Sequence, residues 1–211
     1  MFRNRMDAGI RLAKKLKKFQ HEEGLILAVP RGGIVVAYAV AKELGFPMDL
    51  ILVKKLGHPM NKEYAIGAVS LNEEYIVPHA EASQEYIDEQ ASSIRASLKK
   101  MYPKFLGSGD LRNVKNKTVI VVDDGIATGN TLVLALKMLK EKGPAKIIIA
   151  TPVASVSAVQ KLKMEVKEVI SLLVPNVFFG VGDFYEEFEQ VTDDEVIYYL
   201  ERLRKEMNKV G

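Results

Sequence analysis

Two adjacent carboxylates followed by a loop rich in glycine and threonine form the stretch of this sequence that is best suited to chemistry. Asp123 and Asp124 come directly after the apolar run Val119–Val122, and the loop extends from Gly125 to Thr131. Glycines let a loop turn sharply and present its backbone N–H groups, and the start of the predicted helix that follows adds the positive end of a helix dipole. These features predict an anion site suited to a phosphate.

The acidic pair would repel a phosphate that it faced directly, because like charges repel each other. Asp123 and Asp124 should therefore face groups that donate hydrogen bonds, such as a vicinal diol, whereas Thr128 and Thr131 can add hydroxyl donors to the phosphate site. A diol beside a phosphate suggests a ribose 5-phosphate as the ligand. The alternative is an ordinary strand-to-helix turn with a chance acidic pair.

Basic residues follow two earlier apolar runs of the chain. The loop with Arg31 and Gly32 follows the first run, and Lys54 and Lys55 follow the second. Backbone amides at a strand end and a guanidinium suit phosphate oxygens, and a lysine pair in a compact domain needs an anion or a carboxylate as its partner. The alternatives are a surface salt bridge for the arginine and a solvated lysine pair.

Strands that alternate with helices must position these loops. Apolar runs typical of buried strands alternate with helical patterns, and they lie at Leu25–Val29, Leu50–Val53, Val119–Val122, Lys146–Ala150 and Glu168–Val174. This order predicts an α/β fold, with a mostly parallel sheet of about five strands flanked by helices, whose last helix begins at a capping box formed by Thr192 and Glu195. Because ligands of such sheets bind beyond the carboxyl ends of the strands, the glycine loops, the basic residues and the acidic pair should converge there.

The composition bounds the class of protein. A length of 211 residues with 48% hydrophobic residues suits a single domain over 1–211, and the net charge of +3 is too small to indicate nucleic acid as a partner. No apolar run reaches the ~18 residues that span a membrane. The absence of cysteine excludes disulfides, thiolate catalysis and cysteine-bound zinc. We expect a cytoplasmic protein that binds no membrane.

The motif Val119–Thr131 consists of an apolar strand, an acidic pair and the sequence Gly-Ile-Ala-Thr-Gly-Asn-Thr. It resembles the phosphoribosyl-pyrophosphate (PRPP) motif of the type I phosphoribosyltransferases. The resemblance implies that Asp123 and Asp124 hold the ribose hydroxyls while the following loop wraps the 5-phosphate. It also implies that the basic residues contact pyrophosphate. The implied site residues beside the acidic pair are therefore Arg31, Gly32, Lys54, Lys55, Gly125, Ile126, Ala127, Thr128, Gly129, Asn130 and Thr131.

The reaction implied by the resemblance transfers the 5-phosphoribosyl group of PRPP to a nitrogenous base and releases pyrophosphate. Mg2+ is the implied cofactor, bound mainly through oxygens of PRPP and pyrophosphate rather than by a set of protein ligands. Members of the family that act on 6-oxopurines usually carry a third acid in the loop, where this sequence has Ala127, so the acceptor base stays open. The alternatives are a PRPP- or nucleotide-sensing regulatory protein without turnover, and a phosphatase in which Asp123 and Asp124 bind a metal.

Three further segments complete the prediction. Residues 56–78 form a predicted hairpin that resembles the mobile lid of the family. Residues 79–101 form one long helix with a heptad-like apolar stripe, which packs on its own domain or, as we favour, on a second subunit of a homodimer. Residues 175–191 form a hood in which Phe184 and Tyr185 would stack the base. The alternative is that these rings belong to the core.

Overall fold

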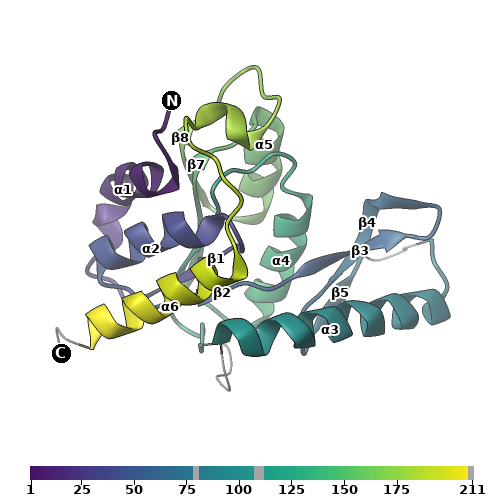
Figure 1. Ribbon diagram of the computed structural model, residues 1–211. Helices are drawn as coiled ribbons and strands as arrows, with labels where there is room; N and C mark the ends of the chain where they lie inside the picture. The colour runs from purple at the N-terminus through teal and green to yellow at the C-terminus, as the bar shows by residue number, and fades with distance from the viewer. Residues whose placement is uncertain (78–80, 107–111, 209–211) are drawn as a thin grey trace.

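The computed structural model describes residues 1–77, 81–106 and 112–208 and confirms the predicted α/β fold class (Figure 1). Its main sheet has five parallel strands in the order β2-β1-β6-β7-β8. These strands are β1 (Gly24–Ala28), β2 (Met48–Leu50), β6 (Thr118–Val122), β7 (Lys146–Val153) and β8 (Glu168–Leu173). In the part of the chain that is described, no helix is long and apolar enough to cross a membrane.

Helices cover both faces of the main sheet (Figure 1). One face carries α1 (Arg5–Leu16), α2 (Gly33–Leu44) and α6 (Asp193–Met207), and the other carries α4 (Asn130–Glu141) and α5 (Val156–Glu165). Alternate strand residues divide between the two layers, so that Ile26 and Ile120 pack with the first group and Leu25 and Val119 with the second. Every residue of β1 and β6 is buried, as strands between two helix layers require.

A three-stranded antiparallel sheet and a long helix form an arm beside the main sheet (Figure 1). The arm consists of β3 (Lys54–His58), β4 (Asn61–Val69), β5 (Glu74–Ile76) and α3 (Gln84–Leu106). The helix α3 begins and ends later than the predicted helix 79–101. Residues 78–80, which belong to the predicted lid and helix, lie outside the described residues.

The apolar stripe of α3 packs within the chain. Ile87 and Ala91 contact Leu56 and Ile66 of the arm, and Leu98 joins the main core. The exposed fractions of Ile87, Ala91 and Leu98 are 5%, 1% and 1%. The chain itself therefore covers the stripe at Ile87, Ala91 and Leu98, which corrects our preference for a dimer contact through these residues, and the homodimer stays a prediction.

The first residues of the chain pair with the segment before α6. The backbone N–H of Phe2 donates to the carbonyl oxygen of Phe184 at 2.8 Å, and the N–H of Glu186 donates to the carbonyl oxygen of Phe2 at 2.9 Å. After a short 3₁₀ helix at 181–184, α6 begins at the predicted capping box of Thr192 and Glu195, which is confirmed. The N-terminus is thus fixed against a segment from near the C-terminus.

Candidate functional site

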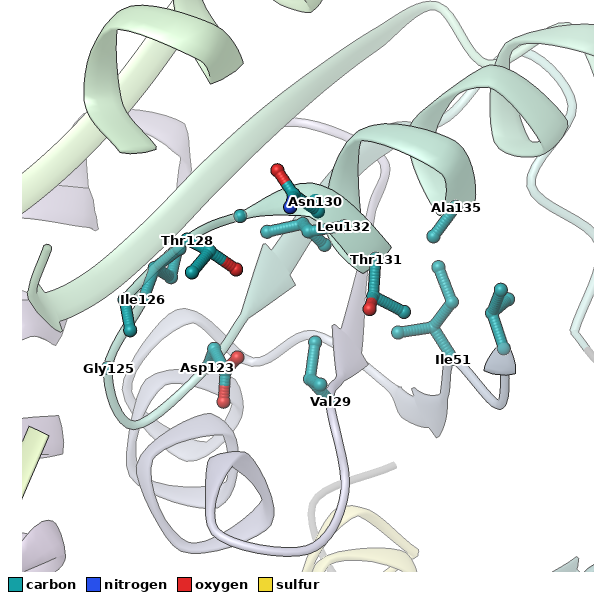
Figure 2. Close-up of a pocket in the computed structure, with 13 residues that line it drawn as sticks. Val29, Ile51, Asp123, Gly125, Ile126, Thr128, Asn130, Thr131, Leu132 and Ala135 are labelled. Carbon is teal, nitrogen blue, oxygen red and sulfur yellow. The ribbon is translucent and has the colours of Figure 1, made fainter. Parts of the chain in front are cut away.

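A cavity of about 210 Å³ lies at the carboxyl ends of β1 and β6, next to the start of α4 (Figure 2). Asp123 borders it on one side, and Val29 belongs to an apolar wall. Figure 2 shows Asp123, Thr128 and Thr131 around a common space, whereas the side chain of Asn130 is turned away. The whole predicted phosphate loop lines the cavity, namely Gly125, Ile126, Ala127, Thr128, Gly129, Asn130 and Thr131.

Hydrogen bonds from α5 and its N-terminal cap hold this loop on its outer side. The hydroxyl of Ser155, which caps α5, donates to the carbonyl oxygen of Ala127 at 2.6 Å. Lys161 of α5 donates to the side-chain oxygen of Asn130 at 2.9 Å. The first N–H groups of α4 have no partner within their own helix, and they lie at the positive end of its dipole. The loop is therefore braced on its outer side and suited to bind an anion on its inner side.

The two acids of the motif face different partners. Asp123 lines the cavity, and burial, followed by the charge of Asp124, raises the pKa of Asp123 well above its usual value. Asp124 is not among the residues that line the cavity, and its Oδ2 lies 2.7 Å from Nε of Arg5. The backbone N–H of Asp124 donates to Oδ1 of Asp123 at 2.8 Å. Asp123 thus faces the cavity, while Asp124 is paired with an arginine of α1.

The glycine loop after β1 lies against the acidic pair. Gly32 packs so closely on the carboxylate of Asp124 that no β-carbon would fit between them. Arg31 belongs to the same loop, its side chain is 43% exposed, and its Nε lies 3.3 Å from Oδ1 of Asp193. The structure therefore brings the two predicted glycine loops together. The guanidinium of Arg31 pairs with Asp193 of α6, and neither Arg31 nor Gly32 belongs to the lining of the cavity, so their role as pyrophosphate contacts stays a prediction.

Comparison with known proteins decides the family. Residues 3–188 match the family described as the phosphoribosyl transferase domain. The chain belongs to the phosphoribosyltransferase family. The matched range includes both glycine loops, the acidic pair and most of the hood, so the resemblance that the motif indicated is confirmed.

Two relatives align with nearly the whole of this chain, and a third aligns with part of it. A Mycobacterium tuberculosis protein with the provisional name of a phosphoribosyl transferase is 33% identical over 216 residues, which cover 100% of this chain and 49% of that protein. The chain spans about half the length of this curated relative. The crystal structure of TT1426 from Thermus thermophilus is 39% identical, with a TM-score of 0.90, and the match covers 96% of this chain and 99% of that one. A ribose-phosphate pyrophosphokinase of Chlorobaculum tepidum is 37% identical over 82 residues, which are 38% of this chain and 25% of that protein.

The structure places the lysine pair of this chain on the arm. Lys54 opens β3, and its Nζ donates to Oγ of Ser97 on α3 at 2.7 Å. Lys55 pairs with Ala68 in the ladder between β3 and β4. Neither lysine belongs to the lining of the cavity, so their role as pyrophosphate contacts stays a prediction.

The aromatic residues of the hood pack on one another. Tyr185 is 6% exposed, its ring stacks on Phe188 with centroids 4.9 Å apart, and its hydroxyl donates to the carbonyl oxygen of Asp124 at 2.6 Å. Burial, followed by the charge of Asp124, raises the pKa of the Tyr185 hydroxyl, which therefore stays a donor. The ring of Phe184 packs on Phe178 at 5.5 Å. Tyr185 thus supports the acidic pair through its hydrogen bond to the backbone of Asp124. The stacking of a base on Phe184 or Tyr185 stays a prediction.

Arg5 is a residue beside the acidic pair that sequence reasoning missed. It opens α1 and lies 119 positions before Asp124, and no motif surrounds it. Only the packing of α1 on α2 and on the neighbouring strands β7 and β8 brings the two residues together. No spacing along the chain could have revealed this contact.

Proposed function

We propose that this protein transfers the 5-phosphoribosyl group of PRPP to a nitrogenous base and releases pyrophosphate. The observation that carries the proposal is the cavity in which Asp123 lies beside a glycine loop at the start of α4. Backbone N–H groups of such a loop, with the hydroxyls of Thr128 and Thr131, suit a 5-phosphate. A carboxylate in the same cavity can accept hydrogen bonds from ribose hydroxyls, and Arg31 and Gly32 in the adjacent loop suit the pyrophosphate.

The reaction breaks the bond between C1 of the ribose and a pyrophosphate oxygen, and it forms a bond between C1 and a nitrogen of the base. In the transition state, negative charge grows on the pyrophosphate while the ribose ring gains the character of an oxocarbenium ion. The guanidinium of Arg31 and the N–H groups of its loop would stabilise the departing pyrophosphate. The phosphate loop and Asp123 would hold the ribose in position. No covalent intermediate with the protein is required.

Magnesium fits this site as an ion that arrives with the substrate. Within the described residues, no three side chains of the kinds that ligate metals cluster to form a site of their own. Asp123 and Asp124 match the one or two carboxylates that Mg2+ usually takes from a protein beside substrate phosphates. When bound, the ion would neutralise charge on the departing pyrophosphate.

Residues 56–78 of the arm are the proposed lid. Ala68 of β4 and Tyr75 of β5 pack on Leu134 and Met138 of α4, and the first turn of this helix borders the cavity. This packing links a movement of the arm to the cavity. A lid that closes over the ribose would exclude water, which could otherwise attack C1 in place of the base.

The residue type at Ala127 narrows the class of base that is proposed as the acceptor. It is exposed at the cavity and offers no group for proton transfer. The proposed acceptor is therefore a base that needs no carboxylate at this position of the loop, such as adenine or a pyrimidine, rather than a 6-oxopurine.

The test is pyrophosphate release from PRPP in the presence of Mg2+ and a panel of nitrogenous bases that includes adenine, uracil, orotate and hypoxanthine. We expect release that depends on one base, is lost in Asp123→Asn and persists in Glu89→Gln, a matched control in which an exposed carboxylate of α3 is removed. PRPP binding without release would overturn the enzymatic proposal and favour the regulatory alternative. Phosphate release from simple esters without PRPP would favour the phosphatase.

A further inference from the structure

An almost buried ion pair joins the start of α1 to the PRPP motif. Nε of Arg5 lies 2.7 Å from Oδ2 of Asp124, and the two side chains are only 11% and 14% exposed. The removal of two charges from water is costly, and the attraction between them repays it only where the geometry is good and further hydrogen bonds are present. The position of such a pair beside the proposed ribose site points to a role in that site.

The guanidinium of Arg5 is fixed in three directions. Nε donates to Asp124, Nη1 donates to the carbonyl oxygen of Glu189 at 2.7 Å, and the central carbon of the guanidinium lies 3.8 Å from the ring centroid of Phe188. The Phe188 ring stacks in turn on Tyr185, whose hydroxyl donates to the carbonyl oxygen of Asp124. We name Arg5, Tyr185, Phe188 and Glu189 the clasp, because together they hold Asp124 by its side chain and by its backbone.

We propose that Arg5 is a positioning residue for PRPP, which fixes the carboxylate of Asp124 for the ribose hydroxyls. This inference rests on the proposed function, and it adds that Asp124, which the resemblance of the motif assigns to the ribose hydroxyls, acts there beside Asp123. Arg5 compensates one of two adjacent negative charges, so Asp124 need not turn away from Asp123. The backbone of Gly32 packs against the same carboxylate. The side chain of Asp124 is therefore held between a guanidinium and a loop that cannot yield space.

The clasp makes the segment before α6 part of the PRPP site. Arg5 does not line the cavity, so it acts on a ligand through Asp124. This indirect action of Arg5 has two measurable properties. Loss of Arg5 weakens the binding of ligands that contain ribose but not the binding of pyrophosphate. The effect of that loss disappears in a protein whose Asp124 has already been changed.

Calorimetric titration with PRPP, ribose 5-phosphate and pyrophosphate measures the first property. We expect Arg5→Gln to raise the Kd of both ribose ligands at least about tenfold, as the misplacement of a binding group does, and to leave the Kd of pyrophosphate unchanged. Arg5→Lys keeps the charge and should recover part of the affinity. Arg3→Gln is the matched control, because the side chain of Arg3 is 74% exposed and lies 3.7 Å from Glu187, so its Kd values should equal those of the wild type.

A double-mutant comparison measures the second property. In the Asp124→Asn background, Arg5→Gln should change the Kd of ribose 5-phosphate by less than about twofold, because two residues of one interaction do not act additively. An equal effect of Arg5→Gln in both backgrounds, or wild-type affinity in the single variant, overturns the inference and leaves the proposed function intact. Wild-type protein that binds neither ribose ligand overturns the proposed function and this inference with it. If circular dichroism finds Arg5→Gln unfolded, Arg5→Lys takes its place in the same comparison.

Discussion

A β-carbon at Gly32 would lie 1.9 Å from Oδ2 of Asp124. Atoms that are not bonded do not approach so closely, so the loop after β1 and the acidic pair after β6 fit together only because residue 32 has no side chain. The parallel register aligns Ala28 with Val122 and brings both loops to the same level of the sheet. The parts of the cavity region proposed for pyrophosphate and for ribose are thus packed against each other before any ligand binds.

Gly32→Ala tests this contact. The added methyl group must displace the carboxylate or the loop, so we expect the free energy of unfolding to fall by about 1–3 kcal/mol and pyrophosphate release to be lost. Thermal unfolding and the release assay measure the two effects. Gly180→Ala is the matched control, because a β-carbon there would lie 3.9 Å from its nearest neighbour on Asp183. Equal losses in both variants would contradict the prediction.

Gly129→Ala tests the need for a left-handed backbone conformation at this position, rather than the room for a side chain. The φ angle of Gly129 is +69°, in the left-handed region, whereas a β-carbon there would meet nothing closer than 3.6 Å. Alanine should therefore lower the free energy of unfolding by about 1–2 kcal/mol through backbone strain and weaken PRPP binding as the loop relaxes. Gly129→Asn should lose less, since asparagine tolerates this conformation. Urea unfolding ranks the three proteins, and an alanine variant as stable as the wild type would refute the argument.

The main sheet could be predicted because burial on both faces leaves a clear pattern in the sequence. The central runs of β1 and β6 contain no charged residue, and their alternation with helical patterns implies parallel pairing. Which surface covers the apolar stripe of α3 could not be predicted in the same way. Ile87 and Ala91 would show the same spacing whether their own chain or a second copy packed on them.

The loop that lines the cavity could be predicted because its residues are contiguous, so one stretch of sequence contains all of it. The partners of Lys54 and Asp124 could not be predicted, because they lie far along the chain. Lys54 follows the apolar run Leu50–Val53 in the sequence, yet in the structure it opens β3 and its ammonium group donates to Ser97 of α3. The packing of α1 and α3 decides these contacts, and local sequence does not encode that packing.

Thr192→Ala tests the contribution of the capping box to stability. The backbone N–H of Glu195 donates to Oγ1 of Thr192 at 3.2 Å, and the N–H of Thr192 donates to the carboxylate of Glu195 at 2.8 Å. Loss of the hydroxyl leaves a donor of the first turn of α6 without its cap, so the free energy of unfolding should fall by about 1 kcal/mol. Thr192→Ser keeps the hydroxyl and should stay close to the wild type in urea unfolding. An alanine variant that matches the serine variant would show that the cap adds nothing.

The raised pKa of Asp123 predicts that stability depends on pH. An aspartate in the unfolded chain ionises near pH 3.9. In the folded protein, burial and the charge of Asp124 hold the Asp123 proton to higher pH, and the charge of Arg5 opposes them. Over this range the folded state binds more protons than the unfolded state, so stability falls as the pH rises from about 3.9 toward the folded pKa.

Asp123→Asn removes the group that causes this loss. The variant should therefore be more stable than the wild type at about pH 7.5, and its advantage in urea unfolding should shrink as the pH falls toward the unfolded value of about 3.9. Glu89→Gln, which removes an exposed carboxylate of α3, should show no such trend. An advantage that stayed constant with pH would mean that asparagine merely packs better. Because Asp123 lines the cavity in which the ribose is proposed to bind, the same variant should gain stability and lose ribose binding together.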